Sequence, residues 1–439
     1  MKILPIQTGI VLGVLFFVVA AAQGNISAMS QEKPNIIFIM ADDLGFETIG
    51  AYGGSSYPTP HLDRMAEQGM RFTHAYSTPL CTPSRVKIMT GKYNYRNYIG
   101  FGLLDPAERT FGHLLQEAGY ETAIAGKWQL LGREYQQHLA GNRRGSYPTE
   151  AGFSEYMLWQ IDERKSRYKN PLLASDGQGN KFYQGKYGPD LFLEFIESYM
   201  EEHRSEPFFL YYPMVLPHFP FQPTPDNSGF ADFDSVSSVN DPRYFGEMVT
   251  YMDKIVGQIR KKTEELGIEE RTLILFVGDN GTDRNVTSRW NGQAIDGHKG
   301  YPDEYGTHVP FIAYWKGQIE PGQVNDNLID FSDFLPTLMD VAGAEIPDDF
   351  HTDGISFYPQ LQGRFWEARE WVFTHYNPNW GDFPFVRYVH NKEWKLYENG
   401  EFYHIADDPR EQNPIPMDQL TPEQKEIRNK FQGILHRLQ

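Results

Sequence analysis

The chain has almost no cysteine and comparatively little positive charge. Cys81 is the only cysteine among 439 residues, so no internal disulfide can form, and Cys81 is either an inert buried thiol or a chemically used one. Asp and Glu number 58 against 40 Lys and Arg, which gives a formal net charge of −18. This acidic balance argues against nucleic acid or an anionic membrane as a partner. An anionic substrate therefore has to be bound by a local group of cations.

Long apolar runs are scarce as well. The run from Ile10 to Ala22 is shorter than the ~20 residues that a membrane-spanning helix needs, follows one positive charge at Lys2, and ends in small residues. We therefore predict that residues 1–22 are a signal peptide of bacterial type. The mature protein is expected to be periplasmic or secreted, with no membrane contact after the signal is removed. No cysteine lies near the cleavage site, which argues against a lipid anchor.

The following 320 or so residues alternate short apolar runs with helical patterns, which is typical of an α/β fold with a large, mostly parallel sheet sandwiched by helices. The expected strands are Ile36–Met40, Thr122–Ala125, Phe208–Tyr212, Leu273–Val277 and Pro310–Tyr314. The expected helices are His61–Gln68, Phe111–Ala118, Leu191–Glu202, Tyr244–Leu266 and Phe331–Ala342. The segment 141–188 is polar and without periodicity, so we expect a long loop or insertion there.

The pattern changes after about residue 345. Four short alternating runs are expected to form strands, and Glu398-Asn399-Gly400 is a hairpin signal between two of them. Thr421, Pro422 and Gln424 form the N-cap pattern of a closing helix. We therefore assign residues 33–345 to a main α/β domain and 346–439 to a small C-terminal subdomain, an antiparallel sheet plus a helix. The runs are Trp371–Tyr376, Phe385–His390, Trp394–Tyr397 and Phe402–Ile405.

Four of the five main strands lead into polar residues suited to an anion and a hard cation. Because ligands bind beyond the carboxyl ends of the strands in open α/β sheets, these side chains are expected to meet at one edge of the sheet. They are Asp42 and Asp43, Lys127, His218, and Asp279 and Asn280.

The oxygen-bearing members of this set predict a metal site. Asp42, Asp43, Asp279 and Asn280 suit a hard cation, Ca²⁺ first and Mg²⁺ second. Zinc is disfavoured because no closely spaced His motif accompanies them. A single Asp pair after a strand is often only a cap, but three carboxylates pressed together without a cation would repel one another.

Cys81 opens the pattern Cys81-Thr82-Pro83-Ser84-Arg85. Pro83 suits the first turn of a helix, which places Cys81 at the end where free N–H groups favour an anion. Arg85 lies one turn further on the same face. A buried cysteine that happens to precede a helix explains these five residues equally well.

This pattern, followed by Thr90-Gly91, resembles the activation motif of the formylglycine-dependent sulfatases, a family of the alkaline phosphatase superfamily. The resemblance covers about residues 33 to 415 and makes 33–345 the catalytic domain. Further segments similar to the family occur in family order: Asn35–Gly45, Thr59–Asp63, Gly69–Phe72, Gly126–Trp128, Pro217–Pro220, Gly278–Gly281 and Val309–Phe311.

The resemblance implies hydrolysis of sulfate esters by a modified cysteine. Cys81 would be oxidised to formylglycine by a separate activating enzyme, and its hydrate would touch the metal and attack sulfur. Asp279 or its neighbour would help to deprotonate that hydrate, and Arg85 would hold it. An ordinary serine or cysteine ester could not break down as the hydrate does, which is the chemical reason for the modification.

The resemblance also assigns the remaining cations. Lys127 and Lys299 would bind sulfate oxygens, and His218 or Lys299 would protonate the departing alcohol. A glycan on the sequon at Asn280 would destroy the proposed metal site, which favours a bacterial source.

One position departs from the family pattern. The family usually reads Gly-Lys-Trp-His-Leu where this chain has Gln129 in place of the histidine. Glutamine cannot shuttle a proton at neutral pH, and general acid–base help contributes ~10²–10⁴ in rate. Either another group such as His298 substitutes, turnover is slow, or the release chemistry differs. The segment 304–310 departs as well, which we interpret as structural variation near the site.

The expected substrate is a sulfated carbohydrate, because of the export signal, the aromatic cluster 376–380 and Arg143 and Arg144 in the segment 141–188. Each of these features also suits packing or solvated surface. Residues expected to contact the substrate are Gln129, His298, Arg143 and Trp380. Two alternatives remain open: a phosphonate or phosphodiester hydrolase on the same scaffold, and a sulfated-glycan-binding homologue with weak turnover because of Gln129.

Overall fold

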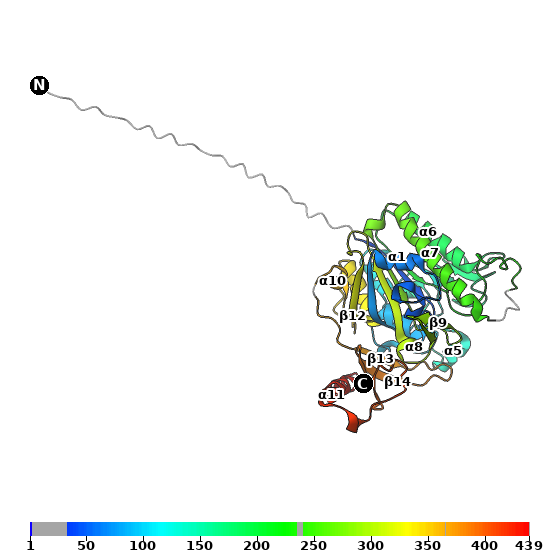
Figure 1. Cartoon of the computed structure of the whole chain (residues 1–439). Helices are drawn as coiled ribbons and strands as arrows, with labels where there is room; N and C mark the ends of the chain where they lie inside the picture. Colours follow the sequence, from blue (N-terminus) through cyan, green and yellow to red (C-terminus); the bar gives the residue numbers. More distant parts are fainter. Residues whose placement is uncertain (2–32, 235–239, 365, 439) are drawn as a thin grey trace. The chain divides into compact units, whose positions relative to one another are not determined.

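The structure is a computed structural model that describes Met1 and residues 33–234, 240–364 and 366–438 (Figure 1). The predicted signal peptide, apart from Met1, lies outside the described residues and stays a prediction. In the part of the chain that the structure describes, none of the helices combines the length and the hydropathy that crossing a bilayer requires.

A ten-stranded mixed sheet forms the centre of the fold, in the order β12-β2-β11-β8-β1-β7-β3-β4-β5-β6. β8, β1, β7, β3 and β4 run parallel to one another, so their carboxyl ends share one edge. The strands are β1 (Asn35–Ala41), β2 (Met70–Tyr76), β3 (Glu121–Lys127), β4 (Glu155–Trp159), β5 (Leu172–Ser175), β6 (Gly179–Phe182), β7 (Phe208–Pro213), β8 (Thr272–Gly278), β11 (His308–Tyr314) and β12 (Gln323–Asp330). The predicted α/β class and its sandwiched sheet are confirmed.

β1 shows why the sheet is covered on both faces. All seven of its residues are buried, and they alternate between two apolar cores. Ile37 and Ile39 pack in the core shared with α1, α6 and α7, whereas Ile36, Phe38 and Met40 pack in the core shared with α2, α4 and α9. A strand buried on both faces is apolar throughout rather than alternating, which is why this run was readable from sequence.

The helices that cover the sheet agree with four of the five predicted helices to within a few residues, and the fifth begins with a 3₁₀ turn at Phe331–Asp333. A short hairpin, β9 (Thr287–Trp290) and β10 (Gln293–Asp296), lies outside the large sheet. The helices are α1 (Pro60–Glu67), α2 (Cys81–Thr90), α3 (Asn94–Asn97), α4 (Phe111–Glu117), α5 (Glu134–Leu139), α6 (Gly188–Glu202), α7 (Phe245–Glu265), α8 (Glu304–Thr307), α9 (Phe334–Val341), α10 (Tyr358–Leu361) and α11 (Pro422–Arg437).

The expectation of a long loop over residues 141–188 was wrong in part. This segment contains β4, β5 and β6, which extend the large sheet beyond β3. β5 and β6 have only four residues each, and all of β6 is exposed. Such short edge strands bury too little to leave an apolar period in the sequence.

The C-terminal part forms a four-stranded antiparallel sheet, as predicted: β13 (Val372–Tyr376), β14 (Val386–His390), β15 (Trp394–Tyr397) and β16 (Phe402–His404). Thr421 caps α11, and Gln424 completes the capping box. Phe431, Ile434 and Leu435 of α11 pack against this sheet. The boundary at residue 345 stays a prediction.

Candidate active site

The acidic residues after β1 and β8 lie side by side because these strands are paired in register, with Ala41 opposite Gly278. The backbone N–H of Asp43 donates to Oδ1 of Asp279 at 2.9 Å. The Nδ2 of Asn280 donates to Oδ1 of Asp43, also at 2.9 Å. Register between two parallel strands thus joins residues separated by more than 230 positions at the carboxyl edge of the sheet.

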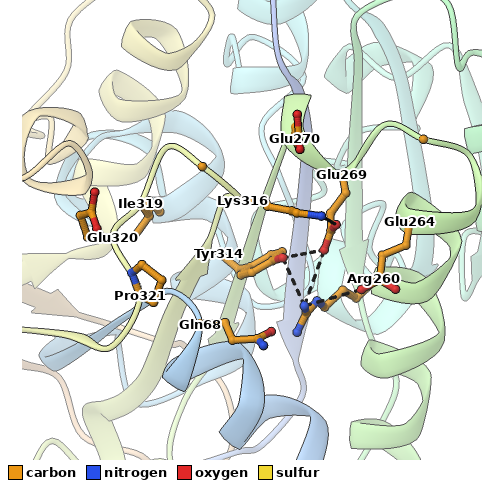
Figure 2. A pocket seen from close by; sticks show the side chains of 12 residues that line it. Gln68, Arg260, Glu264, Glu269, Glu270, Tyr314, Lys316, Ile319, Glu320 and Pro321 are labelled. Carbon is orange, nitrogen blue, oxygen red and sulfur yellow. Dashed lines mark hydrogen bonds and ion pairs between the residues drawn. The ribbon is translucent and has the colours of Figure 1, made fainter.

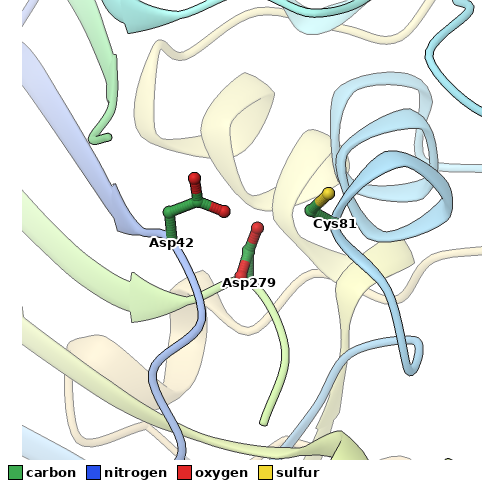
Figure 3. A group of neighbouring side chains, drawn as sticks. All are labelled: Asp42, Cys81 and Asp279. Atoms are coloured by element: carbon green, nitrogen blue, oxygen red, sulfur yellow. The ribbon is translucent and has the colours of Figure 1, made fainter. Parts of the chain in front are cut away.

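Cys81 is the first residue of α2 and is 2% exposed. Its Sγ and a carboxylate oxygen from each of Asp42 and Asp279 all lie within 4.8 Å of one another, and Figure 3 shows the three side chains facing one small space. A second such group contains Asp42, Asp43 and His218. Burial raises the pKa of the Cys81 thiol, so the free N–H groups of α2 do not make it a thiolate.

Two contacts hold the start of α2 in place. The Ser84 hydroxyl accepts from the Thr78 N–H at 3.0 Å, which ties the loop before Cys81 to the first turn of the helix. Further along, the ammonium of Lys87 pairs with Asp330 at 2.7 Å, and both side chains are fully buried. Removing one partner of such a buried pair costs roughly 3–5 kcal/mol, so the pair anchors the helix that presents Cys81.

Two lysines face the carboxylates, Lys127 fully buried and Lys299 with 13% of its side chain exposed. Lys127 Nζ lies 2.7 Å from Oδ1 of Asp42, and Lys299 Nζ lies 2.6 Å from Oδ2 of Asp43. Burial opposes the charge of Lys299, but the negative charge of Asp43 outweighs it and raises the pKa of Lys299 above its usual value. Lys299 therefore keeps its proton at neutral pH.

His218 lies beside Lys299, with its Nε2 3.2 Å from the lysine Nζ. Its Nδ1 lies 2.6 Å from the carbonyl oxygen of Phe219, so Nδ1 bears the hydrogen and Nε2 accepts from Lys299. Burial, and then the positive charge of Lys299, lowers the pKa of His218 well below its usual value. In this arrangement His218 is neutral and orients the Lys299 ammonium.

The contacts of Arg85 are with backbone carbonyl groups, and its expected role toward the hydrate stays a prediction. Its guanidinium donates to the carbonyl oxygens of Lys127, at 2.9 Å, and Trp128. The side chain is 1% exposed, and its Nε has no hydrogen-bond partner among the described residues. Arg85 thus fixes the end of β3 that presents Lys127, which joins α2 to the sheet edge.

The donor set fits a hard cation. Oδ2 of Asp42 and Oδ1 of Asn280 are buried oxygens without a hydrogen-bond partner in the described part of the chain. Burial, followed by the charge of Asp42, raises the pKa of Asp279 well above its usual value, and burial also raises the pKa of Asp43. Unpartnered oxygens and mutually repelling carboxylates are both satisfied by a divalent ion, so this acidic group is a possible metal site.

Arg167 belongs to the site and was missed by the sequence analysis. It is 4% exposed, and its Nη1 lies 3.7 Å from Oδ2 of Asp42. Its guanidinium also lies 3.8 Å from the centre of the Trp159 ring. A single arginine in a polar segment has no motif, so only the fold reveals this position.

The four residues expected to contact substrate fall in three places. Gln129 and Trp380 line one cavity of about 720 Å³. His298 pairs through Nδ1 with Asp303 and stacks on Tyr301 at 4.5 Å. Arg143 is 53% exposed, pairs with Asp105, and does not line that cavity. The structure therefore brings Gln129 and Trp380 together, and it gives His298 and Arg143 other partners.

Figure 2 shows the residues that line another large cavity, of about 710 Å³. The cavity lies where β11 ends and β8 begins, at the end of these strands opposite to the one near Cys81. Its central carboxylate, Glu269, accepts from Tyr314 at 2.6 Å and from Lys316 at 2.7 Å. Arg260 stacks on Tyr314 with 4.3 Å between its guanidinium and the ring centre. Arg260 and Lys316 are both paired with Glu269, so neither cation is left for an anionic ligand.

Comparison with known proteins identifies the fold and the family. The sulfatase family model matches residues 34–344, and the model for the C-terminal region of N-sulphoglucosamine sulphohydrolase matches residues 298–439. The chain belongs to the sulfatase family. This sulfatase is a sulfuric ester hydrolase with the fold of the alkaline phosphatase superfamily, which confirms the resemblance stated from sequence.

Individual relatives agree with this assignment. The sulfatase is 32% identical to bovine (Bos taurus) arylsulfatase A over 380 residues, which is 77% of this chain and 70% of that relative. It is 31% identical to the N-acetylgalactosamine-6-sulfatase of Rattus norvegicus over 387 residues, covering 80% and 70% of the two chains. A structure solved with its substrate D-glucosamine-2-N,6-O-disulfate is similar in fold, with a TM-score of 0.76, 22% identity and coverage of 92% and 97%.

Proposed function

We propose that this sulfatase removes sulfate from a carbohydrate, using formylglycine made from Cys81 and a divalent cation, Ca²⁺ before Mg²⁺. The observation that supports it most is the meeting of Cys81 with Asp42 and Asp279 at the start of α2, within 4.8 Å. The relatives named N-acetylgalactosamine-6-sulfatase, and the substrate bound in the similar glucosamine disulfate complex, support a sulfated sugar.

The metal ligands in this proposal are Asp42, Asp43, Asp279, Asn280 and residue 81. A bound cation would polarise the sulfate oxygens, and formylglycine at position 81 would supply a hydroxyl nucleophile through its hydrate. The all-oxygen donor set and the two unpartnered oxygens of Asp42 and Asn280 support a hard cation over zinc.

The lysines bind and neutralise the anionic ester. Lys127 and Lys299 extend their ammonium groups to the carboxylate cluster, so a sulfate group placed there meets two fixed cations. Lys299 is the proton donor that we propose for the departing alcohol, because its ammonium is held by the neutral Nε2 of His218. Arg85 positions Lys127 through the end of β3, and in this proposal it also holds the hydrate formed at residue 81 of the same helix.

Export and maturation complete the proposal. The apolar run before the described residues supports secretion into a bacterial periplasm or beyond. Conversion of Cys81 requires a separate activating enzyme as a transient partner. The acidic net charge of −18 supports a substrate captured by local cations rather than by the protein's overall field.

The proposal is tested by measuring sulfate release from a panel of sulfated monosaccharides, with an aryl sulfate and an aryl phosphodiester assayed under the same conditions. We expect the sulfated sugar to give the highest kcat/KM and the phosphodiester the lowest, because a sulfate ester presents three nonbridging oxygens to the cation and to Lys127 and Lys299, whereas a phosphodiester presents only two. Faster phosphodiester hydrolysis would favour the phosphodiesterase alternative. Binding of sulfated sugars without any turnover by the matured protein would favour the binding homologue.

A further inference from the structure

The cavity that contains Gln129 adjoins the candidate active site on two sides. On one side Gln129 follows Lys127 by two residues at the end of β3. On the other side Trp380 stacks on Phe101 at 4.7 Å, and Phe101 packs with Cys81 in one apolar cluster. This space of about 720 Å³ is therefore lined by residues that neighbour Lys127 in sequence and pack against the cluster of Cys81.

One residue that lines the cavity, Gln160, has a polar atom that is unpartnered in the described part of the chain. Gln160 is 4% exposed, and its Oε1 has no hydrogen-bond partner among the described residues. The backbone of Gln160 is left-handed, with φ of 59°, and that of Gln129 is left-handed too, with φ of 48°. Left-handed conformations are costly for residues other than glycine, and they cluster where a ligand is bound. A buried amide oxygen of this kind accepts a hydrogen bond from a ligand hydroxyl or N–H.

Two arginines at the cavity have no carboxylate partner. Arg133 and Arg164 line it, and neither forms an ion pair among the described residues. Arg144, which also lines it, is by contrast paired with both carboxylate oxygens of Glu150 at 2.6 Å. Burial, and then the positive charges of Arg167 and Arg133, lowers the pKa of Arg164 from its usual value. An anion placed between these guanidinium groups would relieve their repulsion.

Aromatic and acidic side chains complete the lining. Tyr135 is 64% exposed, and its ring lies 6.0 Å from that of Trp380 at an angle of 62°. Exposed aromatic faces beside polar groups suit the apolar face of a sugar ring. Glu134 and Asp162 also line the cavity, and the Tyr147 hydroxyl donates to Asp162 at 3.3 Å. The unpaired positive charge is thus confined to Arg133 and Arg164.

We propose that this cavity is a subsite for the sugar next to the one that loses sulfate, and that Arg133 and Arg164 bind an anionic substituent of that sugar. The inference rests on the proposed function and adds to it that the substrate is an oligosaccharide with at least two anionic groups. The substituent is a sulfate ester or a carboxylate, which share the geometry that a guanidinium binds. Gln160 accepts a hydrogen bond from the same sugar, and Trp380 and Tyr135 contact its ring.

The test compares substrates that differ only beyond the reacting sugar. The probes are 6-O-sulfated N-acetylgalactosamine, the disaccharide that adds a uronic acid, the same disaccharide with a sulfate on the added sugar, and an aryl sulfate. The variants are Arg133→Gln, Arg164→Gln and the double variant. Arg243→Gln, which removes an exposed arginine paired with Asp241, is the matched control. Steady-state kinetics give KM and kcat separately for each combination of variant and substrate.

We expect each single variant to raise KM for the disaccharides roughly tenfold to a hundredfold, the range of one charge-assisted hydrogen bond, with kcat and aryl sulfate hydrolysis unchanged. Comparing the KM values of the disaccharide with the uronic acid alone and of the disaccharide with the added sulfate shows whether the arginines bind a carboxylate or a sulfate. Equal KM values for wild type and double variant on both disaccharides would overturn the inference. So would a loss of the same size on the aryl sulfate.

A binding measurement keeps this inference separate from the proposed function. Calorimetric titration of the sulfated disaccharide into Cys81→Ala protein needs no maturation and no turnover. A lower affinity of the triple variant Cys81→Ala/Arg133→Gln/Arg164→Gln for the disaccharide supports the subsite. If wild type releases no sulfate from any sugar, that result overturns the proposed function but not the subsite. Affinity that is the same with and without both arginines contradicts the subsite.

Discussion

Nη1 of Arg167 lies 3.7 Å from Oδ2 of Asp42, and Nζ of Lys127 lies 2.7 Å from the other oxygen of that carboxylate. The arginine approaches from the segment after β4, and the lysine from the end of β3. Asp42 is therefore positioned by two cations, one at the end of β3 and one in the segment between β4 and β5. This arrangement offsets part of the repulsion among three buried carboxylates.

Replacing Arg167 with methionine is predicted to destabilise the metal-free protein. The methionine keeps an apolar contact with Trp159 but removes the charge beside Asp42, at a cost of roughly 1–3 kcal/mol. The melting temperature with chelator present should fall, and the rise on adding Ca²⁺ should be larger than in wild type. Arg167→Lys, which keeps the charge, is the control. An unchanged melting temperature in chelator would show that Arg167 does not interact energetically with Asp42.

Asp279→Asn is predicted to have opposite effects with and without metal. Because burial and the charge of Asp42 raise the pKa of Asp279, removing its charge relieves repulsion and raises the melting temperature in chelator, by roughly 2–4 °C per kcal/mol gained. The same change removes a ligand and should abolish the rise in melting temperature on adding Ca²⁺. Asp340→Asn, an exposed carboxylate on α9, should alter neither value. A full Ca²⁺-dependent rise in Asp279→Asn would contradict the metal site.

Gln129→His is predicted to increase kcat for sulfate release at least tenfold near pH 7, because an imidazole can transfer a proton where an amide cannot. Gln129→Asn should leave kcat near the wild-type value. Rates are measured with matured protein at saturating substrate. No gain in the histidine variant would mean that another group already replaces the missing histidine.

Asp253 provides a pH-dependent test of the scaffold. It lies on α7 and accepts from the backbone N–H groups of His61 and Leu62, at 3.1 and 2.8 Å, at the start of α1. Burial raises its pKa from 3.8 to about 6. The folded state therefore binds a proton more tightly than the unfolded state, and this stabilisation is present below about pH 4 and lost as the pH rises through about 6.

In the Asp253→Asn variant residue 253 is neutral at every pH, so the variant does not lose this stabilisation as the pH rises. Its free energy of unfolding relative to wild type should rise between pH 5 and pH 7 by about 1.4 kcal/mol, because wild type loses the remaining stabilisation as the pH passes through about 6. Denaturant unfolding at the two pH values measures the difference. A difference that stays constant with pH would show that Asp253 titrates near its usual value.

The sequence predicted the strands that are buried on both faces and the polar motifs that follow their carboxyl ends. β1 and β8 are apolar after their first residues, Asn35 and Thr272, and the polar residues that follow the strands gather at one end of the sheet because parallel strands run in the same direction. β12 was not predicted, because its sequence, Gln323–Asp330, is mostly polar and pairs with β2 alone at the sheet edge. Its only apolar pair, Leu328 and Ile329, does not alternate over a strand's length.

The sequence predicted which residues belong to the site better than it predicted the pairs that these residues form. The residues around Cys81 could be named, but not that Lys127 pairs with Asp42, or that Arg85 bonds to the end of β3. Those pairings depend on strand order and register. Arg167 and Gln160 were missed altogether, because their segment has no periodicity and the packing that surrounds them comes from other strands.

The central claim, that residue 81 is the nucleophile after modification, is tested most directly by sulfate release from protein whose residue 81 has been characterised by mass spectrometry. Conversion of Cys81 makes its peptide lighter by about 18 Da. The account predicts that turnover is proportional to the converted fraction and is absent in Cys81→Ala. Wild-type turnover by Cys81→Ala, or by protein in which Cys81 is wholly unconverted, would contradict it.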